Sequence, residues 1–203
     1  QQMNEPDKAR EFLDKVLELD PSNDKALDEA LKLRRDKEDF EGVEKMLKVR
    51  LERATERSDR DTILKTFDEL GELYHKKLNL MNEAVDAYEA AQMLDPENPP
   101  RNELLASMYA SNPAQYLDKA VVAHRALMRQ NASRAESYKL LRKLYTEAKR
   151  ADGAWCMCEA LTVLGFAEPD EERFYRRMRA EGAAPAKDCL VDDDWIKLLM
   201  HEN

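Results

Sequence analysis

Apolar side chains recur along the chain in a spacing of four and then three residues, with polar and charged positions between them. The clearest case is the stretch AVDAYEAAQMLDPENP, in which Ala84, Tyr88 and Ala91 are followed by Pro96. Residues at i, i+4 and i+7 share one face of an α-helix, so these three side chains can be buried together. Proline cannot continue a helix. The stretch therefore predicts one amphipathic helix with a stop signal behind it.

The same spacing begins at five positions along the sequence, which are residues 9, 43, 84, 120 and 154. Successive starts lie 34, 41, 36 and 34 residues apart. Each of the last four starts is preceded by a second apolar segment, and these segments read ALDEALKLRR, TFDELGELYH, NELLASMYA and SYKLLRKLY. Two helices in each period of about 34 residues are typical of a helical-repeat array.

The best repeat resembles the tetratricopeptide repeat family, whose first helix carries an aromatic residue, Leu-Gly and Tyr, and whose second carries Ala, an aromatic residue, Ala and Pro. The residues that carry the resemblance are Phe67, Leu70, Gly71, Tyr74, Ala84, Tyr88, Ala91 and Pro96. The resemblance extends over residues 7–164. It implies an all-α fold, a right-handed α-solenoid of about four to five helix-turn-helix repeats with non-repeat helices at the C-terminus.

We expect the array to occupy residues 1–164, with helix pairs near 7–19, 24–56, 59–94, 99–130 and 134–164. The 41-residue interval predicts lengthened helices rather than a standard turn, and the replacement of Gly71 by Leu31, Ala106 and Arg142 in the other repeats predicts a looser helix approach there. Residues 165–203 contain PDEERFYRRMRAEG and VDDDWIKLLM, which predict helices that cap the last repeat or begin the link to a further domain. Because the chain begins with Gln, we expect a fragment of a larger protein.

Composition supports a folded, acidic helical protein, with 37% charged and 43% hydrophobic residues and only five glycines. A net charge of −9 argues against a nucleic-acid partner, because phosphate contacts need clustered Lys and Arg. The sequence contains no run of 18 or more apolar residues, so it predicts no membrane-spanning helix. Three cysteines without a disulfide framework favour a reducing compartment, so we expect a cytoplasmic location.

Candidate chemical groups are few. Cys156 and Cys158 lie two residues apart, so on a helix they point in different directions and cannot share a zinc ion. Glu72 and His75 form a single Glu-x-x-His pair, which di-iron bundles use twice. His124 replaces an aromatic residue on the buried stripe and is expected to pack against a neighbour. We therefore predict no enzyme activity, no metal site and no cofactor.

The family resemblance implies that the first helix of each pair lines a concave groove. The position of each residue within its repeat then indicates which side chains face that groove. The predicted groove residues are Lys25, Asp28, Lys32, Arg35, Lys65, Asp68, Glu72, His75, Lys76, Glu103, Ser107, Glu136, Lys139, Lys143 and Glu147. Their charges are mixed, and the Lys/Asn/Arg clamp with which chaperone-binding members hold a C-terminal carboxylate is not seen.

The leading hypothesis is a non-catalytic protein-interaction module that binds a peptide or protein in this groove. The alternative is an architectural segment whose groove is occupied by its own chain or by a second copy, which makes a homodimer possible. A third interpretation, an RNA-binding helical repeat, requires a basic groove that the sequence does not predict.

Overall fold

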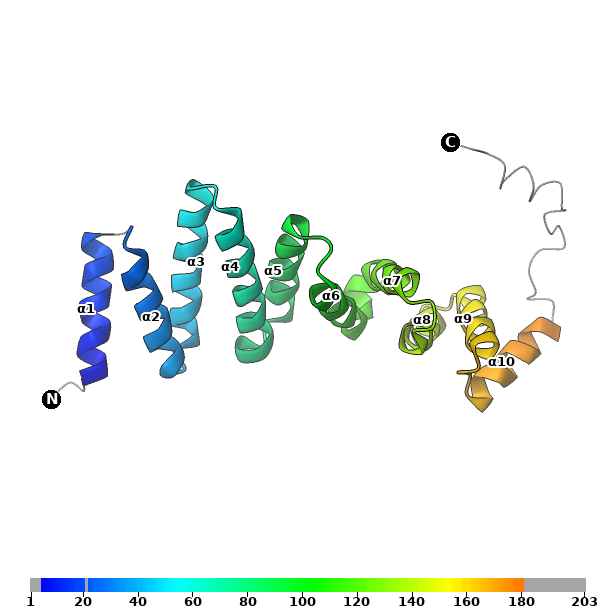
Figure 1. The fold of residues 1–203 in the computed structure, drawn as a ribbon. Coiled ribbons are helices and arrows are strands. Elements are labelled where there is room, and N and C mark those ends of the chain that lie inside the picture. Colours follow the sequence, from blue (N-terminus) through cyan, green and yellow to red (C-terminus); the bar gives the residue numbers. More distant parts are fainter. Residues whose placement is uncertain (1–4, 21, 181–203) are drawn as a thin grey trace, which may run out of the picture. The chain divides into compact units, whose positions relative to one another are not determined.

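The computed structural model describes residues 5–20 and 22–180, and within these residues every regular element is helical (Figure 1). The sequence-predicted helix VDDDWIKLLM lies outside them, as does Cys189. The elements in chain order are α1 (Glu5–Leu19), α2 (Asp24–Asp36), α3 (Phe40–Glu56), α4 (Arg60–Leu73), η1 (Tyr74–Leu78), α5 (Met81–Leu94), α6 (Pro99–Ser111), α7 (Pro113–Gln130), α8 (Ala135–Glu147), α9 (Ala151–Leu164) and α10 (Pro169–Ala180).

The chain divides into two compact units at the junction of Ser111 and Asn112. In the first unit α1 to α6 pack each against the next, and Figure 1 shows α1 to α5 standing side by side in alternating directions. In the second unit α7 to α10 also pack in chain order. Each unit is thus built from helices that pack in chain order, and the all-α helical-repeat fold is confirmed. The boundary falls inside the helix pair expected over 99–130, so the single array over 1–164 stays a prediction.

Side-chain caps explain where several helices begin. Asn23 and Asp39 accept hydrogen bonds from the backbone N–H groups of Ala26 and Gly42, at 3.0 Å in both cases. Asp59 caps α4 in the same way, through the N–H of Thr62 at 3.1 Å. These caps pair backbone donors that a helix start otherwise leaves without a partner.

The lengthened interval around residues 43–84 has a local structural explanation. Helix α3 spans 17 residues, and α4 is continued by five residues of π-helix, η1. A π-turn holds one more residue than an α-turn, so it absorbs extra sequence without breaking the helix. The π-helix ends at Asn79, whose φ of 54° reverses the chain toward α5. The expectation of longer helices is confirmed.

Close packing between α4 and α5 depends on Gly71. A Cβ atom at this position would lie 2.7 Å from ring atoms of Tyr88, whose side chain is buried. Only a residue without a side chain allows this approach. The core of the first unit continues through residues such as Leu27, Leu31 and Leu47, which are at most 2% exposed.

In the second unit a buried histidine joins α7 to α8. His124 is 7% exposed, and its Nδ1 atom lies 3.1 Å from the Oγ atom of buried Ser137. The expectation of a packed histidine is therefore confirmed. Helix α10 packs on α9, where the indole N–H of Trp155 donates to the carbonyl of Tyr175 at 3.1 Å. Within the described residues, this confirms a helix in PDEERFYRRMRAEG.

Candidate functional site

Two neighbouring cavities of the first unit lie between α2 and α4, with α3 beneath them, and we call them together the α2–α4 groove. One cavity has a volume of about 260 Å³ and lies toward the start of α2, and the other measures about 520 Å³ and lies toward its end. Helix α3 packs against both α2 and α4, so its side chains form the floor. The two cavities share Glu69 as a lining residue.

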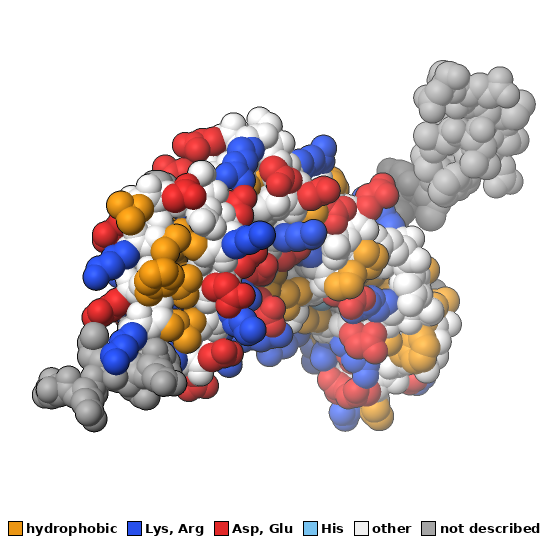
Figure 2. Space-filling view, turned by 60° about the vertical axis from the view of Figure 1, so that its left-hand side comes forward, with side chains coloured by type: hydrophobic (Ala, Val, Ile, Leu, Met, Phe, Trp, Pro, Cys, Tyr) orange, Lys and Arg blue, Asp and Glu red, His pale blue; other side chains and the backbone are white. Residues whose placement is uncertain are grey.

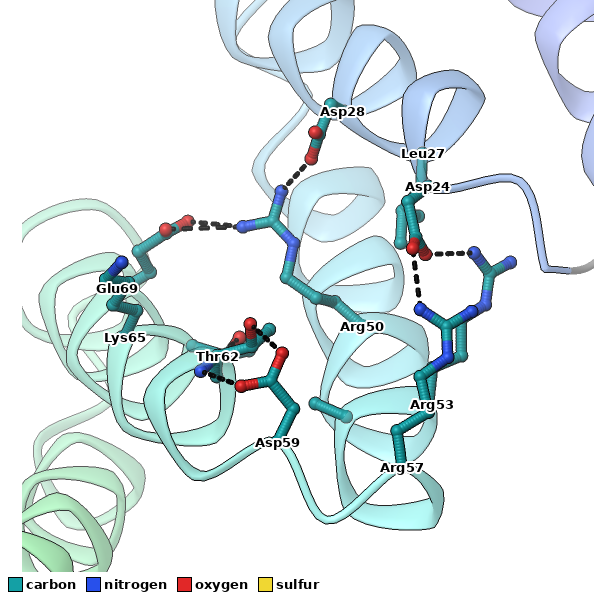
Figure 3. Close-up of a pocket in the computed structure, with 12 residues that line it drawn as sticks. Asp24, Leu27, Asp28, Arg50, Arg53, Arg57, Asp59, Thr62, Lys65 and Glu69 are labelled. Atoms are coloured by element: carbon teal, nitrogen blue, oxygen red, sulfur yellow. Dashed lines mark hydrogen bonds and ion pairs between the residues drawn. The ribbon is translucent and has the colours of Figure 1, made fainter.

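The smaller cavity is polar and internally paired (Figure 3). Asp24 of α2 contacts Arg53 of α3 at 3.7 Å and Arg57, the residue after α3, at 2.6 Å. The hydrogen bond to Asp24 raises the pKa of Arg57. On the α4 side, the hydrogen bonds from Thr62 lower the pKa of Asp59. Arg57 and Asp59 are therefore held in their charged forms.

A charge bridge crosses the groove where the two cavities meet. Arg50 rises from α3 and contacts Asp28 of α2 at 2.6 Å and Glu69 of α4 at 3.3 Å, as Figure 3 shows. Arg35, near the end of α2, contacts the same carboxylate of Glu69 at 2.5 Å. These four side chains, which we call the charge bridge, connect α2 with α4 above α3. They separate the smaller polar cavity from the larger one.

The larger cavity has an apolar floor and a charged rim. Val43, Leu47 and Leu73 are buried beneath it, and Phe40 at the start of α3 is half-buried. Two lysines of the π-helix η1 stand on the rim together with Glu38 and Glu72. Such a combination of apolar floor and few polar groups is typical of binding pockets.

The rim charges of the larger cavity are largely compensated. Lys76 contacts Glu72 at 2.8 Å, and the Nζ atom of Lys77 lies 5.2 Å from the ring centroid of Phe40. Glu38 forms no ion pair with any residue in the described part of the chain. On the face that Figure 2 shows, acidic and basic side chains alternate in the same way. The groove therefore offers mixed charge beside an apolar surface.

Five of the fifteen sequence-predicted groove residues line these two cavities. Asp28 and Lys65 line the smaller one, and Arg35, Glu72 and Lys76 line the larger one. The structure thus brings together residues from α2 and the α4–η1 segment, and their role in binding a partner stays a prediction.

The other predicted residues lie elsewhere. Lys25 and Lys32 are exposed on α2, and Asp68 is bound to Arg101 of α6 at 2.7 Å. In the second unit Lys139 pairs with Glu168 at 2.5 Å. The remaining members are on η1, α6 and α8, and they are His75, Glu103, Ser107, Glu136, Lys143 and Glu147.

Sequence reasoning missed Arg50, Glu69 and Phe40. A signal for Arg50 was present, because it occupies the third position of the four-then-three spacing, where the other repeats carry Ala91 or Leu127. A charged residue on a buried stripe must reach a partner of opposite charge. Glu69 and Phe40 carry no comparable signal, since each lies among other charged or apolar residues.

The described residues hold no group of three His, Cys, Asp or Glu side chains placed to bind a metal ion. Cys158 is buried and Cys156 is exposed, and partial desolvation raises the pKa of both thiols. Over the same part of the chain, no helix combines the length and the apolar character needed to cross a membrane.

Comparison with known proteins points to one family. The tetratricopeptide repeat model matches residues 1–23 and 64–98. The sequence matches none of the curated proteins with which it was compared. Three solved structures are similar at 18% identity, and they are YrrB, described as a TPR protein with an unusual peptide-binding site (TM-score 0.49, 87% of this chain and 84% of that chain), MamA (0.46, 89% and 99%), and BtubC from P. vanneervenii (0.40, 92% and 95%).

At such identities and TM-scores, the assignment depends on the family match and on the chain's own helices. The match over 64–98 covers the repeat in which Gly71 meets Tyr88, and the match over 1–23 covers α1, a second helix of the same pattern. These matches place tetratricopeptide repeats at residues 1–23 and 64–98, and the packing of each helix against the next within each unit agrees with such repeats.

Proposed function

We propose that the first unit binds a segment of a protein partner in the α2–α4 groove and that the chain serves as a non-catalytic interaction scaffold. The larger cavity carries this proposal, because half-buried Phe40 leaves apolar surface there beside charged side chains. Tetratricopeptide arrays present extended surfaces of this kind for binding rather than for chemistry. We place this scaffold in the cytoplasm on the strength of Cys156 and Cys158, which form no disulfide within the described residues.

The geometry favours a ligand with one apolar anchor side chain flanked by charges of both signs. Phe40 supplies the apolar contact for the anchor, above the buried side chains of Leu47 and Leu73. The rim pair of Glu72 and Lys76 is exposed and exchanges readily with partner charges, since exposed ion pairs contribute little stability. Charges of this kind determine selectivity and association rate more than affinity.

Peptides selected from a displayed library on the full chain provide the test. In Phe40→Ala the side chain that lines the floor is removed at the first residue of α3, where it is only half-buried. We expect the affinity of the selected peptides to fall about tenfold or more, as for a central apolar contact of an interface. Phe166→Ala is the matched control, because Phe166 is exposed and lies in the second unit.

Equal affinity for wild type and Phe40→Ala would refute the groove as the binding site. Loss of affinity in Phe166→Ala would move the site to the second unit. Circular dichroism of both variants shows whether the helical fold is retained, so a loss of binding can be separated from a loss of structure.

Self-association is a second candidate, and a specific feature of α1 favours it. Phe12 and Leu19 are 68% and 88% exposed, and they lie seven residues apart on one face of the helix. An apolar face of this kind can be covered by a second copy. Light scattering during gel filtration tests this, because a dimer that becomes a monomer in Phe12→Ser/Leu19→Ser supports self-association through α1. A wild-type monomer at all concentrations refutes it.

A further inference from the structure

A third cavity of the first unit opens on the face opposite to the α2–α4 groove. It has a volume of about 290 Å³ and lies between α3 and α5 with α4 beneath it. The groove uses α3 as its floor and α4 as a wall, whereas this cavity uses α4 as its floor and α3 as a wall. We call it the α3–α5 pocket. A ligand here would not compete for the surface of the groove.

The floor and walls of the α3–α5 pocket are mainly apolar. Leu51 comes from α3, Phe67 and Leu70 from α4, and Ala87 from α5. Leu70 and Ala87 are buried, while Leu51 and Phe67 are partly exposed and reach the opening. Exposed aromatic and aliphatic surface in a concavity is suited to receiving a large apolar side chain.

Two acidic side chains stand beside this opening without compensation. Glu83 and Asp86 are exposed on α5, line the pocket, and form no ion pair within the described part of the chain. Lys48, the one cation of the lining, is already engaged, because its Nζ atom contacts Glu44 at 2.6 Å. The hydroxyl of Tyr74 donates to the same carboxylate at 2.9 Å. The opening therefore carries two uncompensated negative charges.

The exposed edge of α5 continues this surface beyond the pocket. Glu83, Asp86, Ala90 and Met93 follow a spacing of three, four and three residues, which places them on one stripe of the helix. Met93 at its far end is 77% exposed. An exposed methionine adapts to many apolar partners. The stripe thus begins with carboxylates and ends with a free apolar side chain.

We propose that the α3–α5 pocket binds a basic, apolar segment of a protein partner. A leucine-sized or larger side chain of the partner enters the pocket between Leu51 and Phe67. Lys or Arg side chains next to it pair with Glu83 and Asp86, which lie one helical turn apart and so can meet two neighbouring cations. This face is distinct from the groove proposed above, so one chain can hold two partner segments at once.

A fluorescein-labelled helical peptide with one leucine and two arginines on one face is the probe, and fluorescence anisotropy with the full chain is the measurement. We expect Glu83→Gln/Asp86→Asn to weaken probe binding about three- to thirtyfold, the range for two exposed ion pairs. The matched control is Glu29→Gln/Glu97→Gln, which changes the charge equally at two exposed carboxylates away from the pocket. The control is expected to bind as wild type does.

Two altered probes separate the apolar contribution from the electrostatic one. Replacing the leucine by serine removes the anchor, and replacing both arginines by glutamate reverses the charge, so each probe is expected to bind at least tenfold more weakly. Methyl NMR of the wild type locates the bound probe. The signals of Leu51 and Leu70 are expected to shift, whereas those of Leu47 and Leu73, under the α2–α4 groove, are not.

Several results would overturn the proposal. The first is no measurable probe binding, and the second is equal binding by Glu83→Gln/Asp86→Asn and wild type. A serine probe that binds as tightly as the leucine probe would reduce the interaction to non-specific charge attraction. Shifts confined to Leu47 and Leu73 would assign the probe to the α2–α4 groove. The last outcome would support the proposed function while refuting this inference, so the two remain distinguishable.

Discussion

Removal of the Asp68 carboxylate is expected to destabilise the first unit, although the sequence places this residue among exposed groove positions. Arg101 of α6 is 5% exposed, and its guanidinium donates to both oxygens of Asp68, at 2.8 and 2.7 Å. It also donates to the carbonyl of Asp95 at 2.9 Å. The bond to Asp68 raises the pKa of Arg101. The ion pair of Asp68 with Arg101 links α4 to α6 beside the turn that follows α5.

The magnitude follows from the two bonds that Asp68→Ala deletes. Hydrogen bonds to charged groups contribute roughly 1.5–3 kcal/mol each, and breaking a fully buried ion pair costs about 3–5 kcal/mol. The Asp68 side chain is 40% exposed, so water can replace part of the carboxylate. Arg101 also keeps its bond to Asp95. We therefore expect a loss of about 2 kcal/mol in the free energy of unfolding of the first unit.

Native-state hydrogen exchange measured by mass spectrometry assigns the loss to one unit. A loss of about 2 kcal/mol corresponds to roughly thirtyfold faster exchange of the most protected amides in α4 to α6. Amides in α8 and α9 belong to the other unit and are expected to stay unchanged. Glu72→Ala is the control, because its pair with Lys76 is exposed on both sides, so the expected change is about 0.5 kcal/mol or less.

The reasoning would be refuted if Asp68→Ala and Glu72→Ala accelerated exchange equally. In that case water would replace the hydrogen bonds that Asp68 accepts from the buried guanidinium of Arg101. The two hydrogen bonds would then add no more to the free energy of unfolding than an exposed ion pair does. Equal acceleration in both units would also contradict it, because the contacts of Asp68 lie within the first unit.

Three further predictions concern packing, pH and thiol reactivity. Gly71→Ala should lower stability by about 1–3 kcal/mol in thermal melts, because its Cβ would meet Tyr88 at 2.7 Å, whereas the same change in an open helix stabilises by about 1 kcal/mol. Burial, and then nearby carboxylates, raises the pKa of Tyr88 from 10 to about 12. The neutral phenol therefore adds to the free energy of unfolding in full below about pH 10, and this addition should be lost as the pH rises toward 12. Urea unfolding at several alkaline pH values checks this, and Tyr88→Phe should lose less stability over the same range. In Cys156→Ser/Cys189→Ser, the remaining Cys158 is 0% exposed and should react with a thiol reagent only after denaturant is added.

The helices could be predicted from the sequence because their signals are local. The four-then-three spacing identifies buried stripes such as Ala84, Tyr88 and Ala91, all of which are buried. Asp59 and Asn23 reveal helix starts through the short polar side chains that cap them. These signals act over a few residues, so they need no knowledge of the remainder of the chain.

The charge bridge of the groove could not be predicted in the same way, because it depends on how far long side chains reach. Repeat register predicted Asp28 and Arg35 as groove residues. It did not predict their partners, since Asp28 pairs with Arg50 and Arg35 pairs with Glu69. Arg50 lies on a helix expected to face away from the groove, and its length lets the guanidinium pass between α2 and α4. Which charges stay available to a ligand is decided by such pairings.

Part of this missing information is nevertheless present in the repeat period. Side chains on neighbouring first helices that pair across the array lie almost one period apart, since Arg35 meets Glu69 at a separation of 34 residues and Asp68 meets Arg101 at 33. Equivalent positions of successive repeats are neighbours in space, so opposite charges one period apart predict ion pairs.

A second separation recurs between four of the second helices and the first helix that follows each of them, while Arg50 of α3 and Glu69 of α4 lie 19 residues apart. It is 20 residues for Asp14 with Arg34, for Glu89 with Tyr109, for Arg125 with Tyr145 and for Trp155 with Tyr175. The first of these pairs joins α1 to α2, and the last joins α9 to α10. Helix α10 therefore contacts α9 at the separation seen in the other pairs, although its sequence lacks the family pattern and its ion pair with α8, between Arg142 and Asp170, spans 28 residues. The 20-residue separation thus recurs within both units, including at a helix whose sequence lacks the family pattern.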